Sequence, residues 1–186
     1  MGFFSPEIGI DLGTNNVLFY VADKGIVLRE PSLVIVSGGE KRIVQAVGEE
    51  ARQLLGRMPQ GFRAIWPIRE GVIADFDLAA SMLRYFIRRA LGVNYLGKPR
   101  TVLTIPAGVT SMERRAHEEA LLRAGGKLSY IVEGAIASAL GCGLPVYEPQ
   151  GSMIVSIGGG TTEIAVVSLG AAVVGKTLRI GGNAMD

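Results

Sequence analysis

Two related stretches near opposite ends of the chain decide the fold. The first is Ile8-Gly9-Ile10-Asp11-Leu12-Gly13-Thr14-Asn15, and the second is Ile154-Val155-Ser156-Ile157-Gly158-Gly159-Gly160-Thr161-Thr162. Each joins a short apolar strand to a glycine turn that carries hydroxyl or amide side chains, and a second apolar strand follows. This weak internal repeat predicts two similar half-sites within one chain.

The glycine turns are candidates for phosphate binding. A turn rich in glycine lets several backbone N–H groups point at one spot, and neighbouring Thr or Asn side chains add donors. A nucleotide site also needs a carboxylate for Mg²⁺, which prefers oxygen ligands and keeps much of its water shell. Asp11 is the candidate in the first turn, whereas the second turn has the uncharged Ser156 at the matching place. Glycine turns also join strands in many sheets without binding a ligand, so the pattern alone leaves both interpretations open.

The remaining pattern predicts a mixed α/β chain. Strands are expected at 8–10, 17–21, 26–28 running on towards 33–36, 101–105, 153–157, 163–169 and 172–180. Helices are expected at 49–55, 77–91, 110–124 and 133–140. A capping box of Thr110 and Glu113 opens the third helix, on which His117 is expected to face solvent. Cys142 is expected to be a small buried thiol.

Composition excludes several classes of protein. With 186 residues, 48% hydrophobic and 19% charged, the chain can bury a core and is not disordered overall. The 19 Lys and Arg against 17 Asp and Glu are scattered and give a net charge of +2, which argues against a nucleic-acid partner. The single Cys142 permits no internal disulfide and is typical of a reducing compartment. Glu133 and Glu163 interrupt the most apolar stretches, and the N-terminus lacks the features of a secretory signal, so a cytoplasmic protein is expected.

At the two glycine turns the chain resembles the actin superfamily, and within it the MreB/Mbl family. Residues 8–14 are similar to the first phosphate loop of these proteins and residues 158–163 to the second. Further matching segments are 24–32, 66–76, 143–146, 148–153 and 181–186. The resemblance implies an actin-like, ribonuclease H-like α/β fold. Residues 1–150 would form the first domain, with a small lateral subdomain at about 33–74, and residues 151–186 the start of an incomplete second domain.

The resemblance also implies a function. It points to an ATP-dependent filament former at the inner membrane, which maintains rod shape by organising cell-wall synthesis. The implied cofactors are ATP and Mg²⁺, and the implied partners are further copies of the chain and the cell-wall elongation machinery. Lipid contact is implied for an apolar N-terminal tip and for one loop, so the protein would be peripheral to the membrane. The residues concerned are Met1, Phe3, Phe4, Tyr95 and Leu96.

Carried over residue by residue, the family motif implies a set of site residues. The nucleotide-binding residues would be Asp11, Gly13, Thr14, Asn15, Asn16, Gly158, Gly159, Gly160 and Thr161, with Asp11 also serving the metal. Glu133 matches the first Glu of the family's Glu-Glu-Pro-Met segment and would activate the attacking water. Thr161 and Thr162 complete the implied catalytic set. The alternative for Glu133 is a helix N-terminal residue that the helix dipole favours.

Departures from the family pattern favour a second hypothesis. Ser156 stands where the family has Asp, Gly134 and Ala135 replace the second Glu and the Pro, and Val17 replaces Thr. Family chains continue past the position of Asp186, so the sequence corresponds to the N-terminal portion of such a protein. The alternative is therefore a short, non-hydrolysing relative that acts as a binding or regulatory partner of filaments. A sugar kinase or chaperone ATPase of the same superfamily is disfavoured by the matching segments.

Overall fold

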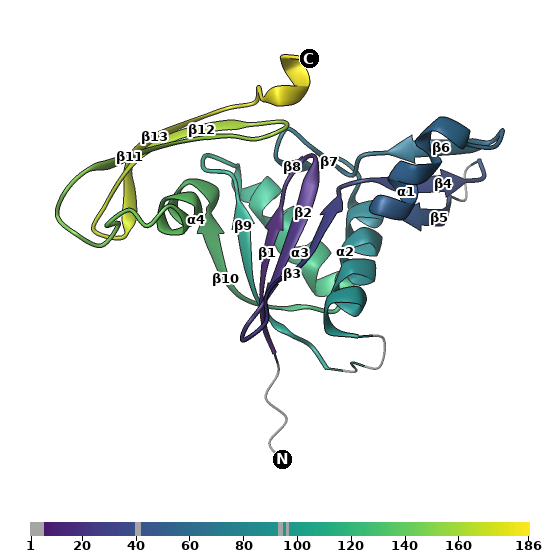
Figure 1. Ribbon diagram of the computed structural model, residues 1–186, viewed down its shortest axis with the longest axis horizontal. Helices are drawn as coiled ribbons and strands as arrows, with labels where there is room; N and C mark the ends of the chain where they lie inside the picture. Colours follow the sequence, from purple (N-terminus) through teal and green to yellow (C-terminus); the bar gives the residue numbers. More distant parts are fainter. Residues whose placement is uncertain (1–5, 40–41, 93–94, 96) are drawn as a thin grey trace.

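The largest sheet forms the centre of the molecule. The computed structural model describes residues 6–39, 42–92, 95 and 97–186. In the order β10-β9-β1-β2-β3, the strand β1 (Glu7–Leu12) lies in the middle, antiparallel to β2 (Asn16–Val21) and parallel to β9 (Arg100–Ile105). The edges are β3 (Gly25–Pro31) and β10 (Lys127–Glu133). Figure 1 shows this sheet as the body onto which the other layers pack.

One face of the central sheet is covered by two helices, α2 (Phe76–Leu91) and α3 (Ser111–Ala124). Alternating residues of β1 and β2 point into this core, where the Phe19 ring meets the edge of Phe86 at a centroid distance of 6.1 Å. The expected capping box is confirmed, because Thr110 and Glu113 satisfy each other's backbone N–H groups. Gly125 ends α3 in the left-handed region, at φ 98°.

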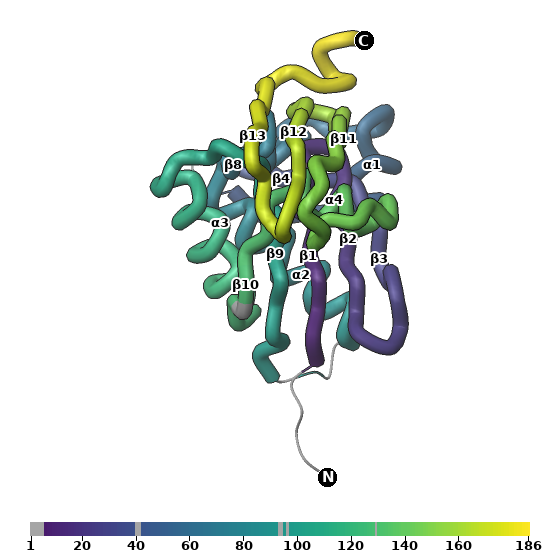
Figure 2. Tube along the Cα trace, turned by 90° about the vertical axis from the view of Figure 1, so that its left-hand side faces the viewer, coloured from purple at the N-terminus to yellow at the C-terminus, as the bar shows by residue number. Residues whose placement is uncertain are grey.

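A second sheet of three antiparallel strands lies across the ends of β1 and β9 (Figures 1 and 2). Its order is β11 (Ser152–Ile157), β12 (Thr162–Ser168) and β13 (Ala171–Leu178), and the chain ends beyond the short turn η2 (Gly182–Ala184). Helix α4 (Gly134–Gly141) packs beneath it, with Ala135 and Ala139 against Ala165 and Val167. Some residues before position 150 thus share a core with the second sheet. The domain boundary there stays a prediction.

The remaining strands form a small lateral unit, at the right of Figure 1. It contains β4 (Val34–Ser37), β5 (Ile43–Val47) and β6 (Phe62–Ile65) in the order β5-β4-β6, with α1 (Glu49–Leu54) and η1 (Leu55–Arg57) beside them. The hairpin of β7 (Ile68–Arg69) and β8 (Val72–Ile73) leads back to α2. Buried Glu30 anchors the unit, because its carboxylate accepts the Glu49 N–H at 2.7 Å and pairs with Arg89 at 3.1 Å.

One sequence prediction about strands was wrong, and five strands, β5, β6, β7, β8 and β10, were not predicted. The third strand was expected to run from 26–28 towards 33–36, but the chain leaves the central sheet at Pro31, which ends β3, and β4 belongs to another sheet. The Ser32 hydroxyl instead donates to the Gly13 carbonyl at 2.6 Å. β10 was not expected at all, although it closes one edge of the central sheet.

Two side chains also lie opposite to expectation. His117 is fully buried, because it points from α3 into the core with Ala120 and Leu121 while the charged residues around it take the solvent side. Cys142 is exposed, because it follows the last turn of α4. In the described part of the chain, no helix is long and apolar enough to cross a membrane.

Candidate functional site

The two glycine turns have the same construction. Each spans four residues between paired strand positions, 13–16 between Leu12 and Val17 and 158–161 between Ile157 and Thr162, and Asn16 is also the first residue of β2. In both, the N–H of the first glycine donates to the carbonyl of the fourth residue, at 3.1 Å in the first turn and 2.8 Å in the second. The hairpin registers make Ser156 the counterpart of Asp11. The internal repeat expected from the sequence is therefore a repeat of hairpin geometry.

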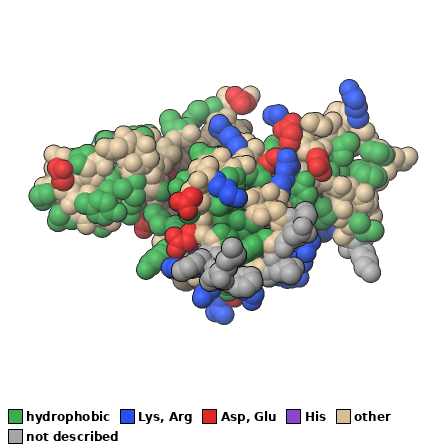
Figure 3. All heavy atoms as spheres, turned by 60° about the horizontal axis from the view of Figure 1, so that its bottom comes forward, with side chains coloured by type: hydrophobic (Ala, Val, Ile, Leu, Met, Phe, Trp, Pro, Cys, Tyr) green, Lys and Arg blue, Asp and Glu red, His purple; other side chains and the backbone are tan. Residues whose placement is uncertain are grey.

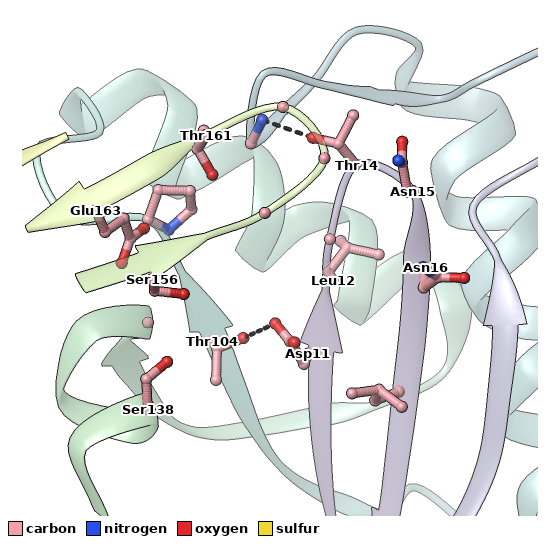
Figure 4. Close-up of a pocket in the computed structure, with 18 of the residues that line it drawn as sticks. Asp11, Leu12, Thr14, Asn15, Asn16, Thr104, Ser138, Ser156, Thr161 and Glu163 are labelled. Carbon is pink, nitrogen blue, oxygen red and sulfur yellow. Dashed lines mark hydrogen bonds between the residues drawn. The ribbon is translucent and has the colours of Figure 1, made fainter. Parts of the chain in front are cut away.

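The turns face each other across a cleft of about 560 Å³ (Figure 4). The central sheet supplies one wall through β1, β2 and the end of β9, and the second sheet supplies the opposite wall. The first residues of α4 form a third side through Gly134 and Ser138. A strand end, a helix start and two hairpin turns thus converge on one space, which is the usual construction of a ligand pocket.

Glycine is required where the walls approach each other. A Cβ on Gly160 would lie 2.5 Å from Thr14 Oγ1, and one on Gly159 would lie 2.4 Å from the Asn15 amide. The Thr14 hydroxyl accepts the Gly71 N–H at 3.0 Å, which ties the first turn to the segment between β7 and β8. The close approach of the two turns therefore requires glycine at both positions.

The two walls are joined by a pair of amides at the mouth of the cleft. Asn15 Nδ2 donates to Asn183 Oδ1 at 2.6 Å, and Asn183 Nδ2 donates to Asn15 Oδ1 at 2.8 Å. Asn183 is fixed in turn by its own N–H, which donates to the Gly159 carbonyl at 2.9 Å. The segment that ends the chain is thereby attached to both turns.

The predicted nucleotide-binding residues gather at one place. All nine line the cleft: Asp11, Gly13, Thr14, Asn15, Asn16, Gly158, Gly159, Gly160 and Thr161. The Asp11 carboxylate accepts the Thr104 hydroxyl at 2.6 Å and is otherwise open to solvent (Figure 4). Their proximity agrees with a shared site, and the role of each residue stays a prediction.

The predicted catalytic residues are more dispersed. Thr161 lines the cleft, but Thr162 and Glu133 are not among the described residues that line it. The Thr162 hydroxyl donates to the Ile180 carbonyl at 2.8 Å, on the side of β12 away from the cleft. Glu133 is the residue at which β10 ends and α4 begins, and it is Gly134 that faces the cleft. The α4 residues that line the cleft are Gly134, Ala137 and Ser138, and none of them is an acid.

Glu163 is a cleft residue that the site prediction missed. It lies directly across the strand pair from Ser156, is only 7% exposed, and its Oε2 has no hydrogen-bond partner. Burial raises the pKa of this carboxyl above its ordinary value, and the nearby carboxylates of Asp11 and Glu133 raise it further. The N–H groups of Ala107 and Ala135 act in the opposite direction. The second hairpin thus carries its acid on β12, whereas the first carries it on β1.

Other lining residues depend on strand register. Thr104 lies beside Asp11 in β9, and Arg29 lies in β3, two strands away on the same face. Neighbouring strands place such residues together, but which residues pair is decided by tertiary structure. The alternation of β9 was the one available signal, because it puts Thr104 opposite to the buried Leu103.

Most of the residues expected to contact lipid lie outside the part of the chain that the structure describes. Met1, Phe3, Phe4 and Leu96 fall outside the described residues. Tyr95 is half-buried, and its hydroxyl is enclosed without a hydrogen-bond partner. On the face in Figure 3, the described Lys and Arg side chains are interspersed with Asp and Glu.

Comparisons with known proteins identify what this arrangement is similar to. A family model described as MreB/Mbl protein matches residues 5–186. The cell shape-determining protein MreB of Escherichia coli (strain K12) is 46% identical over 189 residues, which cover 100% of this chain and 54% of that protein. The cell shape-determining protein Mbl of Bacillus cereus is 44% identical over 183 residues, covering 98% and 55%. The chain therefore spans about half the length of these relatives.

Solved structures show the same fold. MreB5 of Spiroplasma citri bound to AMPPNP superposes with a TM-score of 0.87 at 36% identity, over 98% of this chain and 54% of that one. The same protein bound to ADP gives a TM-score of 0.86. The MamK double helical filament gives 0.75 at 18% identity, which shows the fold alone. The expected actin-like α/β fold is confirmed, with the chain matching only a portion of each neighbour.

Proposed function

Because the chain belongs to the MreB/Mbl family, we propose that its cleft binds a nucleoside triphosphate and that this ligand is ATP. The protein to which the cleft belongs would be an actin-like filament protein that determines cell shape. The observation that carries this proposal is the pair of glycine turns that share one hairpin geometry and face each other across the cleft. Their N–H groups and the Thr14 and Thr161 hydroxyls suit the phosphate tail. The neighbouring MreB5 structures contain AMPPNP and ADP, which supports the same ligand class here.

The donor set fits Mg²⁺ held through its water shell. Asp11 offers one solvent-open carboxylate beside the Thr104 hydroxyl, and Ser156 offers a second hydroxyl across the cleft. Mg²⁺ commonly takes one or two carboxylates together with phosphate oxygens. When bound, the ion would neutralise phosphate charge. In this proposal the two turns orient the phosphates, and Asp11 holds the water bound to the ion.

Filament formation at the inner membrane and the organisation of cell-wall synthesis belong to the same proposal. Support for self-association comes from the fold shared with the MamK filament and from the names of the cell shape-determining relatives. The peripheral membrane contact would use the apolar N-terminal tip. In a vesicle co-sedimentation assay with anionic lipid, replacing Phe3 and Phe4 by Ser should reduce binding, while Tyr147→Ser, a distant exposed aromatic, should not. Equal binding of both variants would refute this contact.

Nucleotide binding is tested at Asp11. Titration of the chain with a fluorescent, non-hydrolysable ATP analogue in excess Mg²⁺ should give saturable binding, and Asp11→Asn should weaken it by no more than about threefold, because Asp11 acts only through the water of the ion. Asp23→Asn is a matched control, because Asp23 lies in the distant β2–β3 turn at φ 66°, which Asn tolerates. No saturable binding by the unmodified chain would refute the proposal.

A second function is nucleotide binding without hydrolysis. It is favoured by two positions at which the family pattern has an acidic residue and this chain has none. Ser156 and Gly134 both line the cleft, and neither carries a carboxylate to activate water or handle Mg²⁺. A complete relative provides the test. Changing the aspartate of Escherichia coli MreB that matches Ser156 to Ser should abolish phosphate release while analogue binding persists. Unchanged hydrolysis would contradict the idea that Ser156 prevents turnover.

A further inference from the structure

A row of side chains crosses the central sheet at the level of the cleft. Thr104 pairs with Asp11, Asp11 with Leu18, and Leu18 with Arg29, so the four residues follow one another through β9, β1, β2 and β3. Register partners share one face of a sheet, and all four line the cleft. Adjacent strands are about 4.8 Å apart, so the Arg29 backbone lies about 10 Å from that of Asp11.

Arg29 has an unusual electrostatic position. It is the only Lys or Arg among the described residues that line the main cleft, where the acids are Asp11 and Glu163. Its side chain is exposed and makes no ion pair with any described residue. Between it and Asp11 lies only the uncharged Leu18. A guanidinium on a flexible stem can therefore reach over Leu18 towards the space above Asp11.

The cleft offers few carboxylates that could hold a divalent cation. The counterpart of Asp11 in the second hairpin is Ser156, and the α4 residues that line the cleft, Gly134, Ala137 and Ser138, include no acid. Glu163 is buried behind the surface, with its Oε2 beside Gly134. A polyphosphate that enters the cleft would meet one open carboxylate, two glycine turns and one guanidinium. Arginine binds phosphate through paired N–H donors and stays charged at every physiological pH.

We propose that Arg29 is a phosphate-binding residue of this cleft, which donates to the tail of the bound nucleotide and supplies charge neutralisation in place of part of that provided by Mg²⁺. Nucleotide binding should consequently persist when Mg²⁺ is removed. This inference rests on the proposed function, because it assumes that the ligand of the cleft carries phosphates. It goes beyond that function because it assigns part of the neutralisation of the phosphate charge to Arg29 and not to Mg²⁺.

The experiment titrates the 186-residue chain with a fluorescent, non-hydrolysable ATP analogue, once in excess Mg²⁺ and once in EDTA. Arg29→Gln removes the charge, Arg29→Lys keeps it without the paired donors, and Arg88→Gln is a control on an exposed site of α2 away from the cleft. Inorganic tripolyphosphate serves as a competitor, because it presents the phosphate tail alone. Circular dichroism of each variant checks the fold.

The unmodified chain should lose less than about threefold in affinity on passing from Mg²⁺ to EDTA. Arg29→Gln should weaken binding about tenfold in EDTA and much less in Mg²⁺, Arg29→Lys should fall between, and tripolyphosphate should compete less well against Arg29→Gln. If Arg29→Gln binds like the unmodified chain in both buffers, Arg29 is only an edge-strand charge and the inference is overturned. If the unmodified chain binds in neither buffer, the proposed function itself fails.

Discussion

Glu163 is the residue whose environment is hardest to explain by folding alone. Its carboxylate is buried among Asp11, Glu133 and backbone groups, and one oxygen has no partner. A buried acid of this kind lowers the stability of the fold, and such groups concentrate at functional sites. Because Glu163 borders the cleft, its position agrees with a site kept for function.

Replacement of Glu163 should stabilise the protein. Burial raises the folded-state pKa above the ordinary 4.5, so stability is greatest below that value and is lost as the pH rises through the folded pKa. At about pH 7.5, Glu163→Gln should raise the free energy of unfolding by about 1 kcal/mol, measured by urea denaturation. Glu119→Gln, on the exposed face of α3, should change it by less than about 0.5 kcal/mol. A loss of stability in Glu163→Gln would contradict this account.

His117 should make stability depend on pH in the opposite direction. Burial lowers its pKa below 6.5, although the contact of Nδ1 with the Glu113 carbonyl, at 2.8 Å, partly opposes this effect. The unfolded chain therefore binds the proton more readily, and stability falls as the pH drops below about 6.5 towards the folded pKa. The slope is at most about 1.4 kcal/mol per pH unit. Denaturation at about pH 7.5 and pH 5.5 should show a smaller loss for His117→Gln than for the unmodified chain, and equal losses would refute the assignment.

The cleft residues of the glycine turns, with Asp11 and Ser156 on the strands that enter them, could be predicted from the sequence, whereas Arg29, Thr104 and Glu163 in the walls could not. The turns can be recognised from the sequence because glycine, threonine and asparagine cluster between apolar strands. Arg29 and Thr104 reach the cleft only because β3, β2, β1 and β9 pair in one particular register. Register depends on which strands pair across long distances in the sequence, so local sequence patterns do not reveal these neighbours.

Among the elements, α3 combines the clearest local signal with a long-range contact. The Thr110 hydroxyl accepts the Glu113 N–H, and Glu113 also accepts from Arg179, which follows β13, at 2.7 Å. The Thr110 N–H, which donates to the Glu113 carboxylate at 2.8 Å, and the Arg179 guanidinium lower the pKa of Glu113. Helix capping here is thus linked to the attachment of the second sheet.

Loss of the cap should therefore be measurable. Thr110→Ala should lower the free energy of unfolding by about 1 kcal/mol, because the Glu113 N–H loses its acceptor. Ser111→Ala, one residue further along, provides a control, since no hydrogen bond of the Ser111 side chain is part of the cap. Urea denaturation of both variants is the measurement. Equal stabilities of the two variants would show that the cap contributes nothing.

The helices were predicted better than the strands for a physical reason. α2 and α3 carry apolar residues at helical spacing and local stop signals such as Gly125. β10 follows two glycines as an edge strand, and β5 and β6 are short, only partly buried strands at the two edges of their sheet. Such strands are held by their neighbours more than by their own composition, so local patterns miss them.

For the molecule as a whole, the cleft depends on polar links between its two walls. Besides the amide pair of Asn15 and Asn183, the Thr177 hydroxyl donates to the Ala107 carbonyl at 2.6 Å, and Arg179 pairs with Glu113. These links join the second sheet and the segment after it to the first glycine turn, to the loop after β9 and to α3, so they fix the two walls of the cleft relative to each other.

The second sheet presents apolar side chains at both of its edges. β11 and β13 have no outer partner strand among the described residues, and Val155 and Val173 are exposed at 49% and 69%. Open apolar edges favour association. Size-exclusion chromatography of the 186-residue chain should show species larger than 19.7 kDa, and Val173→Lys should shift them towards the monomer. A clean monomer from the unmodified chain would contradict the expectation.

Hydrogen exchange tests most directly whether both glycine turns bind the phosphates of one nucleotide. Amide exchange of the chain is followed by mass spectrometry with and without a non-hydrolysable ATP analogue and Mg²⁺. The account predicts slower exchange in peptides covering 12–16 and 157–161 together, with no change in the distant strand 43–47. Unchanged exchange at either turn, under conditions where the analogue binds, would contradict it.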